Sequence, residues 1–286
     1  MNTFGRCLAG GILVAACGAV LPAQTNPPVP VLQIMREYTK PGKNGTVHER
    51  TESLFVQAMT KAKWPTHYIG MTSLSGKTRA LFLVRYESFE ALEKDTAAMA
   101  KNEALSAALD KAQETDGALL DEADQGVFIY REEMSLRTMT DISKQRYLDI
   151  AVYNVRPGRR KEFEEAVKMV KAAYEKGVPS VHWGMYELAY GGDGNVFIAL
   201  TARKTLAELD ADPSISKAFA EAMGEDGMNK LNDLVQKSLE SSQHQLFAFN
   251  PRMSYVEDSW IKSDDFWKVK PAAAPAAKPA AEAKKP

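Results

Sequence analysis

Hydrophobic residues along the chain change from strand-like alternation to helical spacing twice, each time across a short basic turn. In the stretch 147–175 the pattern predicts a strand, the turn Arg156-Pro157-Gly158-Arg159 and a long amphipathic helix. An upstream copy begins with a strand at 31–38, continues through Lys40-Pro41-Gly42-Lys43 and ends in a helical run that reaches Ala62. Because a unit that recurs with the same turn chemistry indicates a repeat, we interpret the chain as an internal duplication.

Each copy continues with the same order of elements. Two strands joined by a turn follow the helix in each copy, at 66–74, 78–86, 180–189 and 196–202. Helical segments come next, and a last strand is predicted at 126–136 in the first copy and at 245–256 in the second. The order βαββαβ is the ferredoxin-like one. The predicted halves are residues 31–137 and 147–256.

Apolar runs in the predicted strands leave no polar face on either sheet. Residues 80–84 (ALFLV) and 196–200 (VFIAL) are apolar on both sides of the strand, whereas an antiparallel sheet with one solvated face alternates apolar and polar residues. The second face must therefore be covered, and the sheet of the other half is the cover that the duplication supplies. The sequence predicts an α+β fold in which two tandem ferredoxin-like halves face each other with their antiparallel sheets as a pseudo-twofold α/β barrel.

The two ends of the chain differ in composition from the halves. Residues 1–23 carry one basic residue and an apolar run shorter than the roughly 20 residues of a membrane span, which is typical of a secretory signal peptide. The sequence VAAC at 14–17 resembles the lipobox of bacterial lipoproteins, so lipoprotein processing stays open beside cleavage near Ala23. We expect an exported protein, periplasmic or extracellular, with a proline-rich spacer at 24–30 and a disordered Ala/Pro/Lys tail at 270–286.

Composition and charge narrow the classes of function. The 286 residues include 36 basic and 37 acidic ones, a net charge of −1, so no overall field favours nucleic acid. Both cysteines, Cys7 and Cys17, fall in the N-terminal segment. If the protein is a lipoprotein, Cys17 is the residue that carries the lipid. Cysteine catalysis and thiolate metal sites are therefore excluded from the predicted halves. We expect no nucleic-acid partner and no transmembrane span, and the oligomeric state stays open.

Two motifs resemble those of NIPSNAP-type members of the dimeric α/β-barrel superfamily. The first motif is the opening of both halves, in which a strand is followed by Lys/Arg-Pro-Gly-Lys/Arg and then a helix. The second motif is the stretch RYESFE at 85–90, after the third strand of the first half. The second half has RKT at 203–205 in its place and so departs from the second motif. The resemblance implies the barrel predicted above. It transfers no single function, because members of the superfamily range from cofactor-free monooxygenases and haem-degrading enzymes to small-ligand binders with no known reaction.

Candidate site residues lie where the second strand of each half begins. His67 and Tyr68 open this strand in the first half, and His182 and Trp183 open it in the second, where Tyr186 follows. A histidine beside an aromatic residue in a partly closed site can act as a general base near neutral pH or as a polar anchor for a ligand. We therefore place ligand binding at these five residues and leave catalytic residues unassigned; a structural role for the histidines is the alternative.

Motifs for metals and cofactors are missing from the sequence. No HExxH or clustered carboxylate motif occurs, so the sequence predicts neither a metal site nor a cofactor. His48 stands near the start of a helix beside Glu49 and Arg50 and is expected to be solvated, and His244 is expected to be exposed. The glycine-rich stretch 191–194 joins two strands instead of opening a helix, which indicates a hairpin turn and not a phosphate-binding loop.

Three hypotheses of function follow from these patterns. The first is an exported protein whose barrel or inter-half cleft binds a small apolar or aromatic molecule. The second is a cofactor-free monooxygenase or related enzyme that uses a cleft histidine with a tyrosine, and the third is a purely structural or interaction protein with a packed interior. The volume of the largest cavity separates them, because a ligand site needs roughly 300 Å³ or more.

Overall fold

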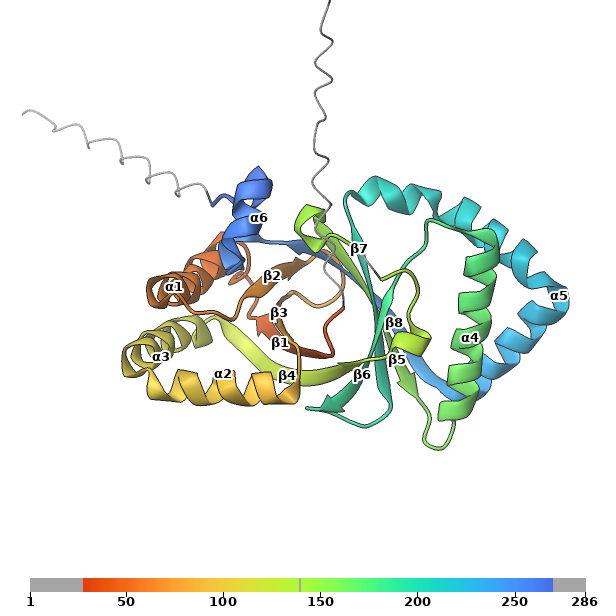
Figure 1. Ribbon diagram of the computed structural model, residues 1–286, viewed down its shortest axis with the longest axis horizontal. Helices are drawn as coiled ribbons and strands as arrows, with labels where there is room; N and C mark the ends of the chain where they lie inside the picture. Colours follow the sequence, from red (N-terminus) through yellow and green to blue (C-terminus); the bar gives the residue numbers. More distant parts are fainter. Residues whose placement is uncertain (1–27, 139, 270–286) are drawn as a thin grey trace, which may run out of the picture.

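The structure, a computed structural model, describes residues 28–138 and 140–269. Its centre is a closed barrel of eight antiparallel strands, with the helices on the outside (Figure 1). The expected signal peptide, most of the spacer and the expected tail lie outside the described residues. Within the described part of the chain, no helix has the length and apolar character that crossing a membrane requires.

The elements appear twice in the same order. The first half contains β1 (Val31–Thr39), α1 (Thr46–Ala62), β2 (Tyr68–Ser73), β3 (Arg79–Tyr86), α2 (Phe89–Lys101), α3 (Glu103–Gly117) and β4 (Leu120–Tyr130). The second half contains β5 (Tyr147–Val155), α4 (Arg160–Gly177), β6 (Gly184–Tyr190), β7 (Val196–Arg203), α5 (Asp212–Ser238) and β8 (Leu239–Phe249), and the short helix α6 (Asp258–Ser263) follows it. The predicted βαββαβ order is confirmed, with the second helical region of the first half divided into α2 and α3.

The two sheets join at their edges into one barrel. The strand order is β1-β3-β2-β8-β5-β7-β6-β4, and β4 pairs with β1 to close it. The halves meet where β2 pairs with β8 and where β4 pairs with β6. Facing sheets are therefore continuous at both edges, so neither half leaves an edge strand unpaired. The predicted barrel of two facing halves is confirmed.

Strand pairing repeats between the halves down to its irregularities. Val31 pairs with Tyr86 in the first half, and Tyr147 pairs with Arg203 in the second. The first strand of each half also has a register shift at the same place, before Thr39 in one and before Val155 in the other. Matching registers allow each position of one half to be compared with its counterpart in the other.

Both faces of the strands are buried, as their two-sided apolar pattern predicts. On β3, Leu81 and Leu83 point into the barrel core, whereas Phe82 and Val84 pack beneath the helices of the first half. The barrel core is formed by alternate residues of strands from both halves, among them Leu32, Ile34, Ile69, Met71, Leu148, Ile150, Phe247 and Phe249. It also contains Trp260 and Trp267, which follow the predicted second half in sequence.

The last strand of each half begins earlier than predicted. The structure has β4 and β8 about six residues upstream of the predicted 126–136 and 245–256. After an initial leucine, Leu120 or Leu239, the first residues of both strands are mostly polar and exposed, so they carry no apolar alternation that would mark a strand. The apolar residues beyond the true strand ends instead form isolated bridges, Leu136 with Trp183 and Tyr255 with Tyr68.

Candidate functional site

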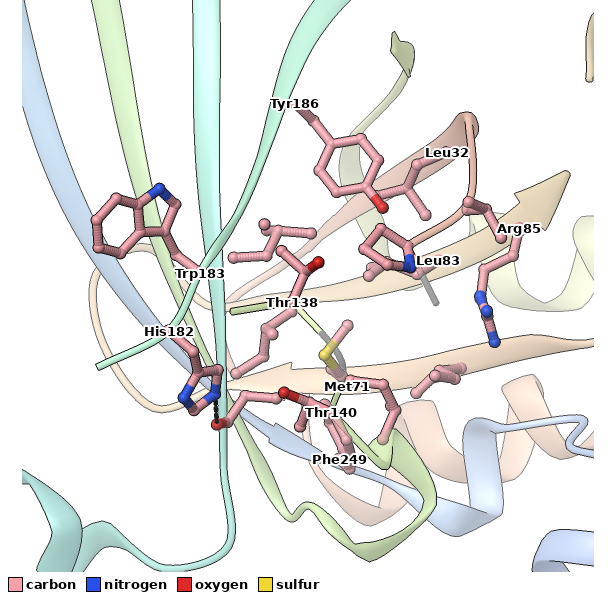
Figure 2. A pocket seen from close by; sticks show the side chains of 18 residues that line it. Leu32, Met71, Leu83, Arg85, Thr138, Thr140, His182, Trp183, Tyr186 and Phe249 are labelled. Carbon is pink, nitrogen blue, oxygen red and sulfur yellow. Dashed lines mark hydrogen bonds between the residues drawn. The ribbon is translucent and has the colours of Figure 1, made fainter. Parts of the chain in front are cut away.

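The interior of the barrel leaves little free space. A pocket of about 110 Å³ remains there, lined by side chains from both halves (Figure 2). Trp260 and Trp267 are buried in the same core, 4% and 2% exposed. Because a ligand pocket needs roughly 300 Å³, the barrel interior alone is too small for a typical ligand.

A larger cavity, of about 720 Å³, lies outside the barrel, between the second-half sheet and helices α4 and α5. Helix α4 packs on the sheet through Phe163 and Val167, whereas α5 packs on α4 through Leu231 and Leu234. Helix α5 also leaves helical geometry at Gly224 (φ 72°, ψ 167°), a backbone conformation that glycine adopts without steric cost. Because α5 rests on α4, part of the outer face of β5, β7 and β8 stays open as the cavity floor.

Two alanines on this floor stand where the first half has large side chains. Ala151 and Ala199 face each other across β5 and β7. Met35 and Phe82 occupy the matching positions across β1 and β3. Phe82 is 3% exposed in the packed core beneath the first-half helices. The second half lacks both large side chains at this place, and the cavity occupies the space that they would fill.

A few polar groups border the otherwise apolar cavity. Arg203 and Asp149 form an ion pair of 3.2 Å at its edge. His182 Nε2 lies 3.1 Å from the carbonyl oxygen of Ala202 (Figure 2). Because a carbonyl only accepts, Nε2 donates this shorter bond, and Nδ1 lies 3.5 Å from a second carbonyl oxygen, that of Ser180. Burial, with the nearby charge of Asp149, raises the pKa of Tyr153 to about 12, so this phenol is a neutral hydrogen-bond donor at pH 7.

Aromatic rings form one wall of the cavity. Tyr174 of α4 lies between the ring of Trp183, at 5.7 Å between centroids, and the ring of Phe219, at 4.7 Å. The indole Nε1 of Trp183 donates to the carbonyl oxygen of Met134 at 2.8 Å, which fixes the orientation of its ring. An aromatic wall, an apolar floor and a few fixed polar groups are the usual composition of a small-molecule site.

The five candidate residues divide between the halves. His182 and Trp183 border both the barrel pocket and the larger cavity. Tyr186 borders the barrel pocket, where its ring extends over the free space (Figure 2). His67 borders a separate pocket of about 30 Å³, and Tyr68 is buried beneath the helices of the first half. The structure thus brings three of the five residues together and places the other two elsewhere.

The two candidate histidines occupy equivalent positions, although an alignment of Gly70-Met71 with Gly184-Met185 in the sequence sets them one position apart. The backbone N–H of Gly70 donates to Ser254 Oγ at 2.9 Å, and that of Met185 donates to Ser135 Oγ at 2.8 Å. The counterpart of Gly70 is therefore Met185 and not Gly184. With this shift of one residue, the histidine three positions earlier in each half is at the same place in the fold.

His48 is buried and not solvated, so that expectation is wrong. It is 3% exposed, as is Glu52 one helical turn later, while the apolar Leu54 is 38% exposed. The helix therefore turns a polar stripe towards the sheet, contrary to the apolar periodicity. The spacing of His48 and Glu52, four residues apart on one helix, is the sequence signal that could have shown it. His244 is exposed, as expected.

The cavity floor was not predicted either, because an alanine carries no signal by itself. Ala151 and Ala199 acquire meaning only when their cross-strand pairing and their large counterparts in the first half are known. Pairing of this kind depends on register, which a single sequence does not fix.

Solved structures resemble the chain over most of its length. A proposed monooxygenase from Fusobacterium nucleatum matches with a TM-score of 0.51 and 14% identity, over 78% of this chain and 93% of that chain. The fold is that of the dimeric α/β-barrel proteins. An anthrone oxidase-like protein has a TM-score of 0.49 at 12% identity (80% and 94% covered), and a mutant chlorite dismutase from Candidatus Nitrospira defluvii has 0.45 at 10% (79% and 92%).

Sequence comparison adds no relative. No protein-family profile and no curated protein matches the chain. At the low identities of the solved structures, the likeness shows the fold alone. The NIPSNAP-type resemblance stays a prediction, and function must be argued from the site.

Proposed function

We propose that the protein is an exported α/β-barrel protein that binds a small apolar or aromatic molecule between the second-half sheet and helices α4 and α5. The observation that carries the proposal is the cavity there, of about 720 Å³, well above the roughly 300 Å³ at the lower end of ligand pockets. Export is supported by the N-terminal pattern of residues 1–23.

The lining of the cavity favours a ligand with an apolar body and one or two polar groups. Tyr174 and Trp183 offer aromatic faces for stacking or edge contacts. Tyr153 offers a hydrogen-bond donor, and the ion pair of Asp149 and Arg203 offers a charged rim. A flat aromatic molecule with a hydroxyl or carbonyl group fits the aromatic faces with its ring and the donor and the charged rim with its polar group.

Replacement of Ala199 by phenylalanine is expected to weaken ligand binding strongly without loss of stability. The new ring would take the place that Phe82 has in the first half and fill the cavity floor. Because filling a cavity adds apolar contacts, the melting temperature should stay equal or rise. The measurements are native mass spectrometry of protein purified from its own host and titration with a naphthalenesulfonate fluorescent probe, whose affinity should fall about tenfold or more, or about 1.4 kcal/mol.

The matched control is Thr201→Ser on the same face of β7, which keeps the hydroxyl that donates to the carbonyl oxygen of His182 at 3.2 Å. This change removes one methyl group and adds no bulk to the cavity, so the bound mass and the affinity for the probe should stay close to those of the parent protein. Equal probe binding by the Ala199→Phe variant and the parent would place the ligand elsewhere and contradict the proposal.

A second candidate function, a cofactor-free monooxygenase-like enzyme, is favoured by the position of His182. Its Nε2 is held by the carbonyl of Ala202 at 3.1 Å, so Nδ1 would have to leave its longer contact with the carbonyl oxygen of Ser180, at 3.5 Å, to accept a proton from a bound molecule. Once a bound molecule is known, His182→Gln separates the two functions. Binding with loss of any oxygen uptake would support the enzyme, whereas unchanged oxygen uptake would exclude His182 as its base.

A further inference from the structure

Four ionisable side chains meet beneath the helices of the first half. Each offers one ligand atom, and these atoms all lie within 4.8 Å of one another; the residues are Glu37 of β1, His48 and Glu52 of α1, and Asp116 of α3. His48 Nε2 lies 3.3 Å from a carboxylate oxygen of Glu37, 3.3 Å from one of Asp116 and 3.6 Å from one of Glu52. We call these four residues the His48 cluster.

The His48 cluster is buried and carries more negative than positive charge. His48 and Glu52 are each 3% exposed and Asp116 is 1% exposed, while the side chain of Glu37 is 20% exposed and leaves an opening to solvent. Among the described residues, the ion pairs of these three carboxylates all go to His48. Because a buried charge without a partner is costly, three carboxylates around one imidazole call for a further positive charge.

Several buried polar atoms of the cluster have no hydrogen-bond partner among the described residues. Among the described residues, Oε2 of Glu37, Nε2 of His48 and Oε1 of Glu52 are buried without a hydrogen bond. An independent observation comes from Tyr68, which is 8% exposed and whose buried hydroxyl also has no hydrogen-bond partner in the described chain. Burial, followed by the charges of Glu52 and Glu37, raises the pKa of Tyr68, so its hydroxyl lies within electrostatic range of the cluster.

We propose that the His48 cluster binds one divalent cation of the first transition series, with Zn²⁺ and Mn²⁺ as the best fits. An imidazole nitrogen suits Zn²⁺, and carboxylate oxygens suit Mn²⁺. The sequence predicted no metal site, because the four ligands come from three elements spread over 80 residues and form no local motif. Thr51 supports the arrangement, since its hydroxyl lies 2.5 Å from Asp116 Oδ1, a contact of the kind that orients metal ligands.

The geometry of the cluster concentrates negative charge at one buried place. The three carboxylates each have an oxygen within 3.6 Å of His48 Nε2. The resulting negative potential favours a bound cation, which would supply the positive charge that three buried carboxylates need.

The fold itself does not need charged residues at this place. Strand register identifies the counterpart of Glu37, and the spacing to the last strand that of Asp116. The counterparts of His48 and Glu52 follow because α1 and α4 end at the same distance before Gly70 and its equivalent Met185. These counterparts are uncharged and line the larger cavity; they are Tyr153, Phe163, Val167 and Val235. One half therefore folds with apolar and phenolic side chains where the other buries three carboxylates, which points to a function for the charges beyond packing.

The test is metal binding by the chelator-dialysed mature protein, measured with Zn²⁺ and with Mn²⁺ by calorimetry and thermal melting. We expect one ion per chain and a melting temperature that rises with ion concentration. In Glu52→Gln, affinity should fall by about 100-fold or more, because changes even to groups behind the ligands cost about 10- to 100-fold. The metal-free melting temperature of this variant should not fall, since a buried carboxylate and its repulsion are removed.

Two further variants keep the test decisive. Glu37→Gln lies at the exposed edge of the cluster, so it should fold even if Glu52→Gln does not, and it should also lose affinity and the melting shift. The control Glu114→Gln changes an exposed carboxylate on α3 and should bind as the parent does. Absence of binding by the parent, or equal binding by the parent and both cluster variants, would overturn the proposal.

Discussion

Replacement of Trp267 by alanine is expected to lower the free energy of unfolding by about 4 kcal/mol, in the range of large-to-alanine changes in cores. Trp267 is 2% exposed, and its ring lies 5.3 Å from that of Trp260 and 6.1 Å from that of Phe249. Its Nε1 donates to the carbonyl oxygen of Ser143 at 2.7 Å, a buried acceptor that alanine would leave without its partner. Equilibrium unfolding in urea, followed by circular dichroism, measures the loss.

Two graded variants separate packing from the hydrogen bond. Trp267→Phe keeps most of the ring but removes the donor, so we expect a loss of about 1–3 kcal/mol. Val269→Ala changes a side chain that is 52% exposed and should stay within about 0.5 kcal/mol of the parent. If Trp267→Ala cost no more than Val269→Ala, the segment after β8 would not be part of the barrel core.

The barrel could be predicted because its evidence is local. Basic Pro-Gly turns before amphipathic helices mark both halves, and strands such as β3 are apolar on both faces. Each signal needs only a few neighbouring residues to be read. The pairing of β2 with β8 and of β4 with β6 then follows from two facing sheets whose edges need partners.

The sites could not be predicted because their evidence is not local. The cavity floor at Ala151 and Ala199 depends on which residues pair across the strands. The His48 cluster depends on Asp116 of α3 reaching a residue 68 positions earlier, at 3.3 Å. Of the candidate residues, His182 and Trp183 were found at the larger cavity because both lie at a strand start that the fold places beside it.

The two halves carry different side chains at the same location between the first strand and the helices, charged ones in the first half and aromatic ones in the second. The space between the first strand of a half and its helices holds Glu37 and His48 in the first half, and the phenol of Tyr153 and the ring of Phe163 in the second. Both halves share the same strand register. The duplicated fold thus keeps its backbone while the side chains at this place decide between a charged cluster and an apolar cavity.

Replacement of Gly70 by alanine is expected to lower the free energy of unfolding by about 3 kcal/mol or more. A Cβ at this position would lie 2.2 Å from the backbone oxygen of Met253, closer than any real contact, so a strand or the chain beside it must move. Movement would break two hydrogen bonds of Gly70. Its N–H donates to Ser254 Oγ at 2.9 Å, and its carbonyl oxygen accepts from the N–H of Asn250 at 2.9 Å. Urea unfolding measures the loss.

Gly184→Ala is the matched control, because simple alignment of the sequence pairs Gly184 with Gly70. A Cβ at Gly184 would meet only the ring of Tyr186, at 3.5 Å, which is ordinary contact. We therefore expect no destabilisation there, and a gain of up to about 1 kcal/mol from the less flexible unfolded chain. Equal destabilisation by both changes would mean that the two glycines are equivalent after all, and that the shift of one residue that aligns Gly70 with Met185 is wrong.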